Sequence, residues 1–318
     1  MARERRTLVL LFGETRAGEL TWESFSVNVL DALEADLALY VRADEEPNPF
    51  HERAAHLATY PEDGDWAAEY DRISGGRDWR SLLELSPFVL GGIEDAEHPQ
   101  IGTSAILLFY RRLLAEWLKR DGLVDRYDWF VLTRSDFLWP LPHPPVARLS
   151  DRHLYTLDGE QYGGITDRHM VLPRRYVLAF LEMVDEVFTN PRELREAALR
   201  FRAHQRAHFF NLEQTLALLL KQVGLWPRLR YLPYVPFAVR TEDTPTGWSL
   251  GRYAEDLGCF VKYPTERARS GIASQFIRDG SSWDTYLAPV RGLPKRRRMR
   301  RALEESGLRE RATFPPDL

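Results

Sequence analysis

Cysteine is almost absent from this chain of 318 residues, in which Cys259 is the only one. A single thiol excludes an internal disulfide and any zinc cluster built on several thiolates. Long hydrophobic runs are also lacking: stretches such as Leu8–Phe12 and Ile106–Tyr110 are far shorter than the roughly 20 residues that span a bilayer. No apolar signal-peptide core precedes the first predicted strand. Together these absences predict a protein of the reducing cytoplasm.

The chain is acidic overall but basic at one place. Its net charge is −4, yet the segment Lys295–Arg301 alone carries six cations, which leaves about −10 for the remainder. An acidic body argues against nucleic acid as a partner, because nucleic-acid binding requires a positive face on the folded domain. The basic segment has two interpretations: a peripheral contact with anionic lipid headgroups at the inner face of the membrane, or a solvated helix end.

The opening of the chain predicts a parallel sheet. Thr7–Phe12 and Asp36–Arg42 have the composition of buried strands. Between them, a helix with Thr21 as its cap is expected to run to about Leu33. A strand, a helix and a strand in this order are the repeating unit of parallel α/β sheets.

Helical periodicity, caps and short apolar runs predict the later elements. The helices expected are two short ones at Asp65–Ile73 and Asp78–Leu85, one from Thr103 to Gly122, one at Arg175–Phe188 and one each from Asn190 and Asn211. The strands expected are a central one ending near Thr133, then His153–Leu157, Arg168–Leu172 and Phe237–Arg240. This order predicts one α/β domain with an α-rich C-terminal half.

The stretch Tyr127–Asp136 carries the strongest functional signal. Its apolar middle is typical of a strand buried on both faces, and it stops abruptly at Arg134-Ser135-Asp136. Charged groups at the carboxyl end of such a strand lie at the edge where open α/β sheets bind ligands. A carboxylate there can hold a divalent metal, and a guanidinium can neutralise phosphate. The alternative is an Arg–Asp ion pair that closes a turn.

The loop Gly13–Gly18 follows the first strand and is a candidate nucleotide site. It has neither the spacing of a phosphate-binding P-loop nor that of a dinucleotide-binding loop. Glu14 and Arg16 are nevertheless placed to contact a nucleotide base or ribose. The alternative interpretation is a surface turn.

A second polar loop, Asp158–Asp167, separates two predicted strands. Gly163-Gly164 would let a ligand approach the backbone closely, and Glu160 or Asp167 can serve as a general base near an acceptor hydroxyl. The alternative is a hydrophilic hairpin loop.

Glu213 is a candidate second base, although a carboxylate in the first turn of a helix is also favoured by the helix dipole alone. His204 and His208 have the spacing of a zinc protease, but Gln205 stands where such a site requires Glu. We therefore interpret these histidines as ordinary residues of a helix surface.

The order of these motifs resembles that of bacterial GT-A glycosyltransferases of the lipopolysaccharide-synthesis (WavE-type) kind. The matching segments are Tyr127–Asp136, Gly163–Arg168, Glu213-Gln214 and Phe237–Arg240. The resemblance implies a GT-A-like (Rossmann-like), mixed and mostly parallel sheet flanked by helices. It divides residues 1–290 into a nucleotide-binding half (1–136) and an acceptor half (137–290), followed by a basic tail (291–318). It also implies sugar transfer from a nucleotide-sugar donor to a hydroxyl of a glycan or small-molecule acceptor, in surface polysaccharide or glycoconjugate synthesis.

The resemblance assigns roles to individual residues. Asp136 stands at the last acid of the Asp-x-Asp motif and would bind Mn²⁺ or Mg²⁺, although Arg134 replaces the first acid. Donor binding falls to Gly13, Glu14, Arg16, Arg134, Ser135 and Asp136, acceptor binding to Glu160, Tyr162, Gly163, Gly164 and Arg168, and proton removal to Asp167 with Glu213 as second candidate. Tyr162 or Trp139 would stack on a sugar. Two alternatives stay open: a non-catalytic sugar-nucleotide or glycan-binding relative, and a nucleotidyltransferase.

Overall fold

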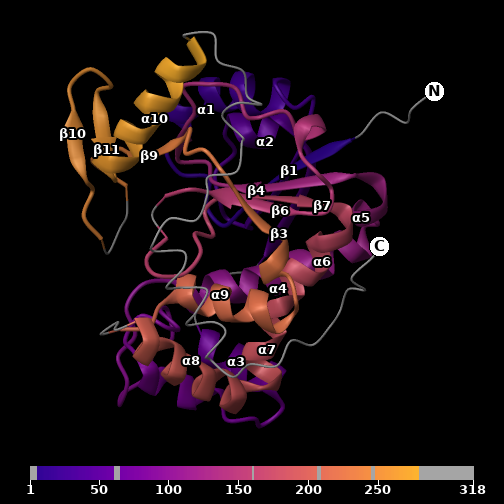
Figure 1. The fold of residues 1–318 in the computed structure, drawn as a ribbon, viewed down its shortest axis with the longest axis vertical. Helices are drawn as coiled ribbons and strands as arrows, with labels where there is room; N and C mark the ends of the chain where they lie inside the picture. The colour runs from indigo at the N-terminus through magenta and orange to yellow at the C-terminus, as the bar shows by residue number, and fades with distance from the viewer. Residues whose placement is uncertain (1–5, 61–64, 160, 206–208, 245–247, 279–318) are drawn as a thin grey trace.

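A seven-stranded sheet forms the centre of the molecule (Figure 1). The computed structural model describes residues 6–60, 65–159, 161–205, 209–244 and 248–278. In sheet order the strands are β3 (Ala54–Tyr60), β2 (Asp36–Arg42), β1 (Thr7–Phe12), β4 (Trp129–Thr133), β7 (Met170–Pro173), β6 (Leu154–Leu157) and β8 (Leu229–Leu232).

The sheet is mixed and mostly parallel, which confirms the predicted α/β class. β1 pairs in parallel with β2 and β4, and β2 pairs in parallel with β3. β7 alone runs against its neighbours β4 and β6, whereas β6 and β8 are again parallel. Both halves of the chain therefore contribute strands to one sheet.

Helices cover both faces of this sheet (Figure 1). One face carries α3 (Trp66–Ser74), η2 (Trp79–Leu85), α4 (Ser104–Arg120), α6 (Arg174–Glu182), α7 (Glu186–Thr189), α8 (Pro191–Gln205) and α9 (Leu212–Gln222). The other carries α1 (Gly18–Phe25), η1 (Ser26–Asp31), α2 (Pro49–Arg53) and α10 (Pro264–Arg278). Short helices complete the connections: α5 (Leu123–Arg126), η3 (Val146–Arg148), η4 (Met183–Asp185) and η5 (Trp226–Arg228).

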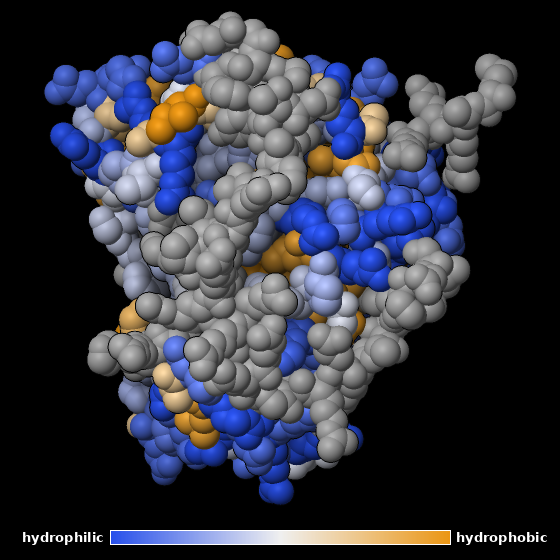
Figure 2. Space-filling view, in the orientation of Figure 1, coloured by the Kyte–Doolittle hydropathy of each residue, from blue (hydrophilic) through white to orange (hydrophobic). Residues whose placement is uncertain are grey.

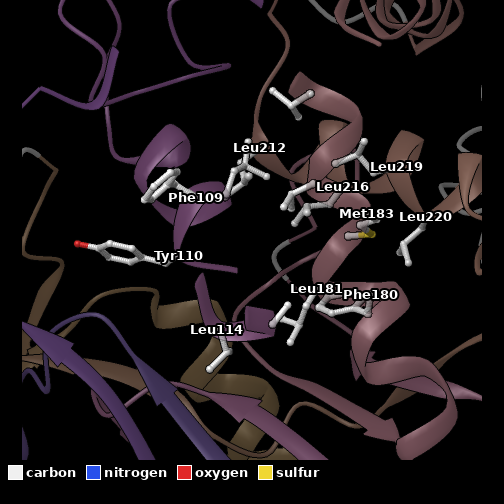
Figure 3. Close-up of a cluster of buried hydrophobic side chains, with 14 of the residues drawn as sticks. Phe109, Tyr110, Leu114, Phe180, Leu181, Met183, Leu212, Leu216, Leu219 and Leu220 are labelled. Carbon is white, nitrogen blue, oxygen red and sulfur yellow. The ribbon is translucent and has the colours of Figure 1, made fainter. Parts of the chain in front are cut away.

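Alternation along β1 explains this three-layer arrangement. Leu8 and Leu10 point into one hydrophobic core, and Val9 and Leu11 point into the other. Because all four are at most 3% exposed, the strand is buried on both sides, as its apolar sequence predicts. Figure 3 shows part of the first core, where side chains of α4, α6 and α9 meet.

A second, four-stranded sheet adjoins the first at the carboxyl end of β4. Its strands, in the order β10 (Arg252–Ala254), β11 (Cys259–Val261), β9 (Phe237–Arg240) and β5 (Phe137–Leu138), are all antiparallel. Only Arg134, Ser135 and Asp136 separate β4 in the large sheet from β5 in the small one. The C-terminal half is rich in helices, as predicted, and also supplies all the strands of this small sheet.

Two expectations about local structure were wrong. The first helix begins at Gly18 rather than after Thr21, which is buried inside it. The Thr21 hydroxyl donates to the carbonyl oxygens of Ala17 (2.9 Å) and Ser135 (2.6 Å), so it ties α1 to the segment after β4 instead of capping a helix. β3 was also missed, because it is an edge strand whose partly exposed Ala, His and Thr residues lack an apolar pattern.

Hydrophilic side chains dominate the face of the molecule shown in Figure 2, with a recessed hydrophobic area near its middle. No helix among the described residues is long and apolar enough to cross a bilayer. The segment Lys295–Arg301 and Glu160 lie outside the described residues. The predicted lipid contact of that segment therefore stays a prediction.

Two histidines are buried behind the carboxyl end of β4. The carbonyl of Pro144 accepts from Nδ1 of His143 (2.7 Å), so Nε2 of neutral His143 accepts from Nε2 of His169 (3.2 Å). Nδ1 of His169 then accepts from the Thr133 hydroxyl (3.0 Å). Burial lowers the pKa of both imidazoles, that of His143 to about 4. The lowered pKa values keep both rings neutral at neutral pH.

This pair predicts acid destabilisation. Below about pH 6.5 the histidines bind protons in the unfolded chain but not in the folded chain, so the free energy of unfolding falls. The decrease reaches about 3 kcal/mol as the pH approaches the folded pKa of His143. Denaturation midpoints between pH 7.5 and 5 should therefore fall. The variant His143→Gln, although less stable at pH 7.5, should show a flatter dependence. An equal fall in both proteins would show that other groups control it.

Candidate functional site

Charged residues from three strands meet at one edge of the large sheet. The parallel strands β1 and β4 end there, with Leu11 paired to Thr133, and the antiparallel β7 begins there, with Met170 paired to Leu132. The loop after β1, the segment Arg134–Asp136 and the residues before Met170 therefore lie side by side. This is the edge at which open α/β sheets bind ligands.

Arg134 and Asp136 form an ion pair within this edge. Nε of Arg134 donates to Oδ1 of Asp136 (2.7 Å) and Nη2 donates to Oδ2 (2.5 Å). Burial alone would raise the pKa of the Asp136 carboxyl, but the charge and hydrogen bonds of Arg134 hold it below its usual value. The Asp136 side chain is only 5% exposed, whereas that of Arg134 is 33% exposed. Of the two interpretations of this strand end, the structure therefore has the Arg–Asp ion pair.

A divalent metal does not fit the residues around Asp136. Mn²⁺ and Mg²⁺ require several oxygen ligands with free lone pairs, and both carboxylate oxygens of Asp136 already accept from a guanidinium. Among the described residues, no group of three His, Cys, Asp or Glu side chains is placed to hold a metal ion. We therefore assign no chemical step at this edge to a metal.

Asp167 is held by an arginine that the sequence did not single out. Nη2 of Arg111, a residue of α4, donates to Oδ2 of Asp167 (2.7 Å), and Nη1 donates to the carbonyl of Leu107 (2.8 Å). Burial would raise the pKa of Asp167, but Arg111 outweighs it and the net shift is downward. A carboxylate stabilised in its charged form is a weak proton acceptor.

Glu213 has the opposite environment. It is half-buried in the first turn of α9, and no described residue forms a salt bridge with it. Burial, reinforced by the negative charge of Asp167, raises the pKa of Glu213 to about 7. A carboxyl that titrates near neutral pH is suited to general acid–base chemistry. The structure therefore favours Glu213 over Asp167 as a proton acceptor.

The local sequence fixes Glu213 at this edge. The Asn211 side chain accepts from the backbone N–H of Gln214 (3.0 Å), and the Gln214 side chain accepts from that of Asn211 (3.1 Å), which is the predicted capping box. The loop before β7 packs on this helix start: Ile165 N–H donates to the Glu213 carbonyl (2.9 Å), and the Asn211 amide donates to that of Tyr162 (3.1 Å).

Gly163 and Gly164 pack against this helix start rather than against open space for a ligand. A Cβ on Gly164 would lie 1.9 Å from the Glu213 carbonyl oxygen, a distance that no atom pair tolerates. Gly163 has a φ of +82°, which favours glycine. We expected these glycines to leave room for a ligand beside the backbone. That expectation was wrong, because it is the start of α9 that lies against the glycines.

We predict that Gly164→Ala will both destabilise the fold and displace Glu213. Overpacking of this kind costs about 1–3 kcal/mol, measurable by urea denaturation. Any Glu213-dependent activity should fall by roughly tenfold or more, because small displacements of a reacting group are costly. Gly271→Ala is the control: its Cβ would meet nothing within 4 Å, and helical alanine is favoured over glycine. Unchanged stability and activity in Gly164→Ala would contradict the role assigned to this contact.

Arg168 lies beneath the edge instead of on an open acceptor surface. Only 7% of its side chain is exposed, and Nη1 donates to the carboxylate of Glu266, which is fully buried on α10. The second oxygen of Glu266 accepts from the Ala238 N–H (3.3 Å). This buried pair joins the loop before β7 to the small sheet.

Two further cations come from the small sheet, Arg240 at the end of β9 and Lys262 directly after β11. Nζ of Lys262 lies 4.8 Å from the ring centre of Tyr263, whose ring also contacts the Arg168 guanidinium (4.9 Å). Arg240 is 3% exposed and donates to the Ser249 carbonyl (2.6 Å). Burial and the charges of neighbouring arginines lower the pKa of Lys262 to about 7.

The loop after β1 borders a pocket of about 330 Å³. Its lining residues are Glu14, Thr15, Arg16, Arg42, Glu45, Glu46 and Asn48. Arg16 and Arg42 contact Glu14 at 2.6 and 3.5 Å, so the two arginines and the acid are pre-arranged at the pocket wall. Gly13, with a φ of +89°, allows the chain to turn into this loop.

The remaining predicted residues divide by exposure. Ser135 is 5% exposed, and its hydroxyl donates to the Glu14 carbonyl (3.5 Å), so it positions the two loops. Trp139 is 1% exposed, and the expectation that it stacks on a sugar was wrong. Tyr162 is 40% exposed at the rim of this edge, and its ring lies 6.3 Å from that of Tyr263.

One segment has the sequence of a nucleophilic serine motif but not the structure that such a motif requires. Gly247-Trp248-Ser249-Leu250-Gly251 has the spacing of a hydrolase nucleophile elbow. Such an elbow lies between a strand and a helix, whereas Ser249 lies in the connection from β9 to β10. Its hydroxyl accepts from the Gly251 N–H (3.1 Å). We therefore assign no nucleophile to Ser249.

Comparison with known proteins adds no assignment, since neither the protein-family models nor the curated proteins gave a match to this chain.

Proposed function

We propose that this protein is a glycosyltransferase that moves a sugar from a nucleotide-sugar donor to a hydroxyl of an acceptor. The observation that carries the proposal is that a cation and a carboxyl able to accept a proton lie at the same sheet edge. Glu213 is a carboxyl with a pKa near 7 and no salt bridge among the described residues, and Arg134 is a partly exposed cation at the end of β4. A proton acceptor and a fixed cation at one sheet edge suit the attack of a hydroxyl and the departure of a phosphate.

The fold supports the proposal at a coarser level. A mixed, mostly parallel sheet flanked by helices is the architecture expected of a GT-A-like enzyme, and it is the architecture found. The pocket beside β1 and β2 has room for the base or ribose of the donor, with Arg16 and Arg42 at its wall. A fold alone does not determine the reaction, so the proposal depends on the residues at the sheet edge.

In the proposed reaction Glu213 takes the proton of the acceptor hydroxyl while its oxygen attacks the anomeric carbon of the donor. The bond from that carbon to the donor phosphate breaks, and the negative charge passes to the phosphate. Arg134 offsets this charge, and Asp136 holds the guanidinium in place. Arg111 keeps Asp167 charged, and that charge keeps the pKa of Glu213 high. Attack opposite to the leaving group inverts the anomeric centre.

A panel of sugar nucleotides tests the proposal. UDP-, GDP-, CMP- and dTDP-sugars, each with and without Mn²⁺ or Mg²⁺, should include one donor that slowly releases its nucleoside phosphate in water. The Glu213→Gln variant should bind that donor but release much less. If no donor is either bound or hydrolysed, the proposal is refuted.

The full engagement of Asp136 also favours a second candidate, a non-catalytic relative that binds a sugar nucleotide. Tight donor binding without turnover would support it. Diphosphate release from a nucleoside triphosphate and a sugar phosphate would instead support a nucleotidyltransferase.

A further inference from the structure

Two cations at the sheet edge have no carboxylate partner among the described residues. Arg134, Arg168 and Arg111 each form a salt bridge, with Asp136, Glu266 and Asp167 respectively. Among the described residues Lys262 forms no salt bridge and lies over the Tyr263 ring, and the side-chain hydrogen bond of Arg240 goes to a neutral carbonyl. A buried guanidinium without a carboxylate is costly unless an anion joins it.

The register of the small sheet places these two cations on one face. Lys262 N–H donates to the Ala238 carbonyl (2.9 Å), and Phe260 is the register partner of Arg240. Because side chains alternate along each strand, Lys262 and Arg240 project from the same face as diagonal neighbours. Burial and the charges of Arg134 and Arg240 lower the pKa of Lys262, so like charges surround this amine.

Arg134 lies close enough to Lys262 and Arg240 for its charge to act on both. Val239 N–H donates to the Asp136 carbonyl (2.9 Å), so β9 lies directly beside the residue that forms the ion pair with Arg134. Since Asp136 neutralises only one of these three cations, the excess approaches two positive charges below about pH 7, the pKa of Lys262, which matches a diphosphate.

We propose that Arg134, Arg240 and Lys262 bind the diphosphate of the donor directly and hold it without a divalent metal. This rests on the proposed function for the identity of the donor. It also accounts for the absence of a fitting metal site among the described residues: the carboxylate that would hold the ion is occupied by Arg134, and cations of the small sheet supply the charge instead. Arg and Lys donors suit phosphate oxygens in number and charge.

Calorimetric titration of the full chain with inorganic pyrophosphate tests the inference without any sugar. At pH 6.5, binding in EDTA should be within about threefold of binding in Mg²⁺, and Lys262→Met should weaken it by roughly tenfold or more. Lys262→Arg should retain most of the affinity, which shows that the charge matters. Arg252→Met is the matched control: Arg252 pairs with Val261 and so lies on the opposite face of the same sheet.

Pyrophosphate binding that requires Mg²⁺, or that is equal in Lys262→Met and the wild type, would overturn the inference. Its failure is distinct from that of the proposed function. Turnover of a sugar nucleotide that depends strictly on a metal would refute the inference and keep the transferase. Metal-free pyrophosphate binding without turnover of any donor would do the reverse.

Discussion

Replacing Glu213 with glutamine is expected to lower kcat by roughly 10²- to 10⁴-fold, the range typical for loss of a general base. Glutamine keeps the shape and the helix position but cannot accept a proton. Donor affinity should change little, because Glu213 is assigned to the acceptor hydroxyl. Single-turnover rates with saturating donor measure the effect directly. A variant that keeps a tenth or more of the wild-type rate would exclude Glu213 as the base.

The pH profile supplies a second readout of the same group. Since Glu213 acts in its charged form, the wild-type rate should rise with pH through about 7, where the pKa of this carboxyl lies. In Glu213→Gln that rising limb should vanish. An unchanged profile in the variant would assign the limb to another group.

The same substitution should make the fold more stable at high pH. The pKa of Glu213 is raised from 4.5 in the unfolded chain to about 7 in the folded one. The charged carboxylate therefore lowers the free energy of unfolding above pH 7, and this effect is absent below pH 4.5. Partial exposure reduces this cost, and we expect a gain of about 1–2 kcal/mol for Glu213→Gln at pH 8. Urea denaturation at pH 8 and pH 5 measures it. A lower rate together with higher stability distinguishes loss of a base from damage to the structure.

The second large effect is expected at Glu266. The Glu266→Gln variant leaves Arg168, which is 7% exposed, without a counter-charge, and breaking a buried pair in this way costs about 3–5 kcal/mol. The midpoint of urea unfolding should fall accordingly. Because Glu266 also accepts from the Ala238 N–H, the small sheet should loosen first, which hydrogen exchange can detect.

The neighbouring residue gives the control. Arg267 lies on the same helix and pairs with Asp256, but these side chains are 36% and 64% exposed. Arg267→Met should therefore change stability by less than about 1 kcal/mol. Equal effects of the two substitutions would mean that the Arg168–Glu266 contact contributes no more than a surface pair.

The sequence predicted the central strands well, for a physical reason. Thr7–Phe12, Asp36–Arg42 and Phe237–Arg240 are the bounds of β1, β2 and β9, because strands buried on both faces require short uninterrupted apolar runs. β10 and β11 have three residues each, too few to show any period, and were not predicted. The edge strand β3 is stabilised by pairing with β2 rather than by its own composition.

The site was predictable only where strand ends determine it. The abrupt stop at Arg134-Ser135-Asp136 located the edge, but the sequence left open whether Asp136 holds a metal or pairs with Arg134, as it does. The choice between Asp167 and Glu213 as the base depends on Arg111, which precedes Asp167 by 56 residues along the chain. Lys262 reaches the edge through a sheet whose pairing no local pattern reveals.

The lone cysteine has a practical consequence for studying this edge. Cys259 is 3% exposed on β11, and burial raises its thiol pKa above the usual range, so it reacts slowly with alkylating reagents. A thiol introduced at the exposed Tyr162 would consequently be labelled selectively, with no need to remove the native one first. A fluorophore attached there would lie at the rim and report on the arrival of a ligand.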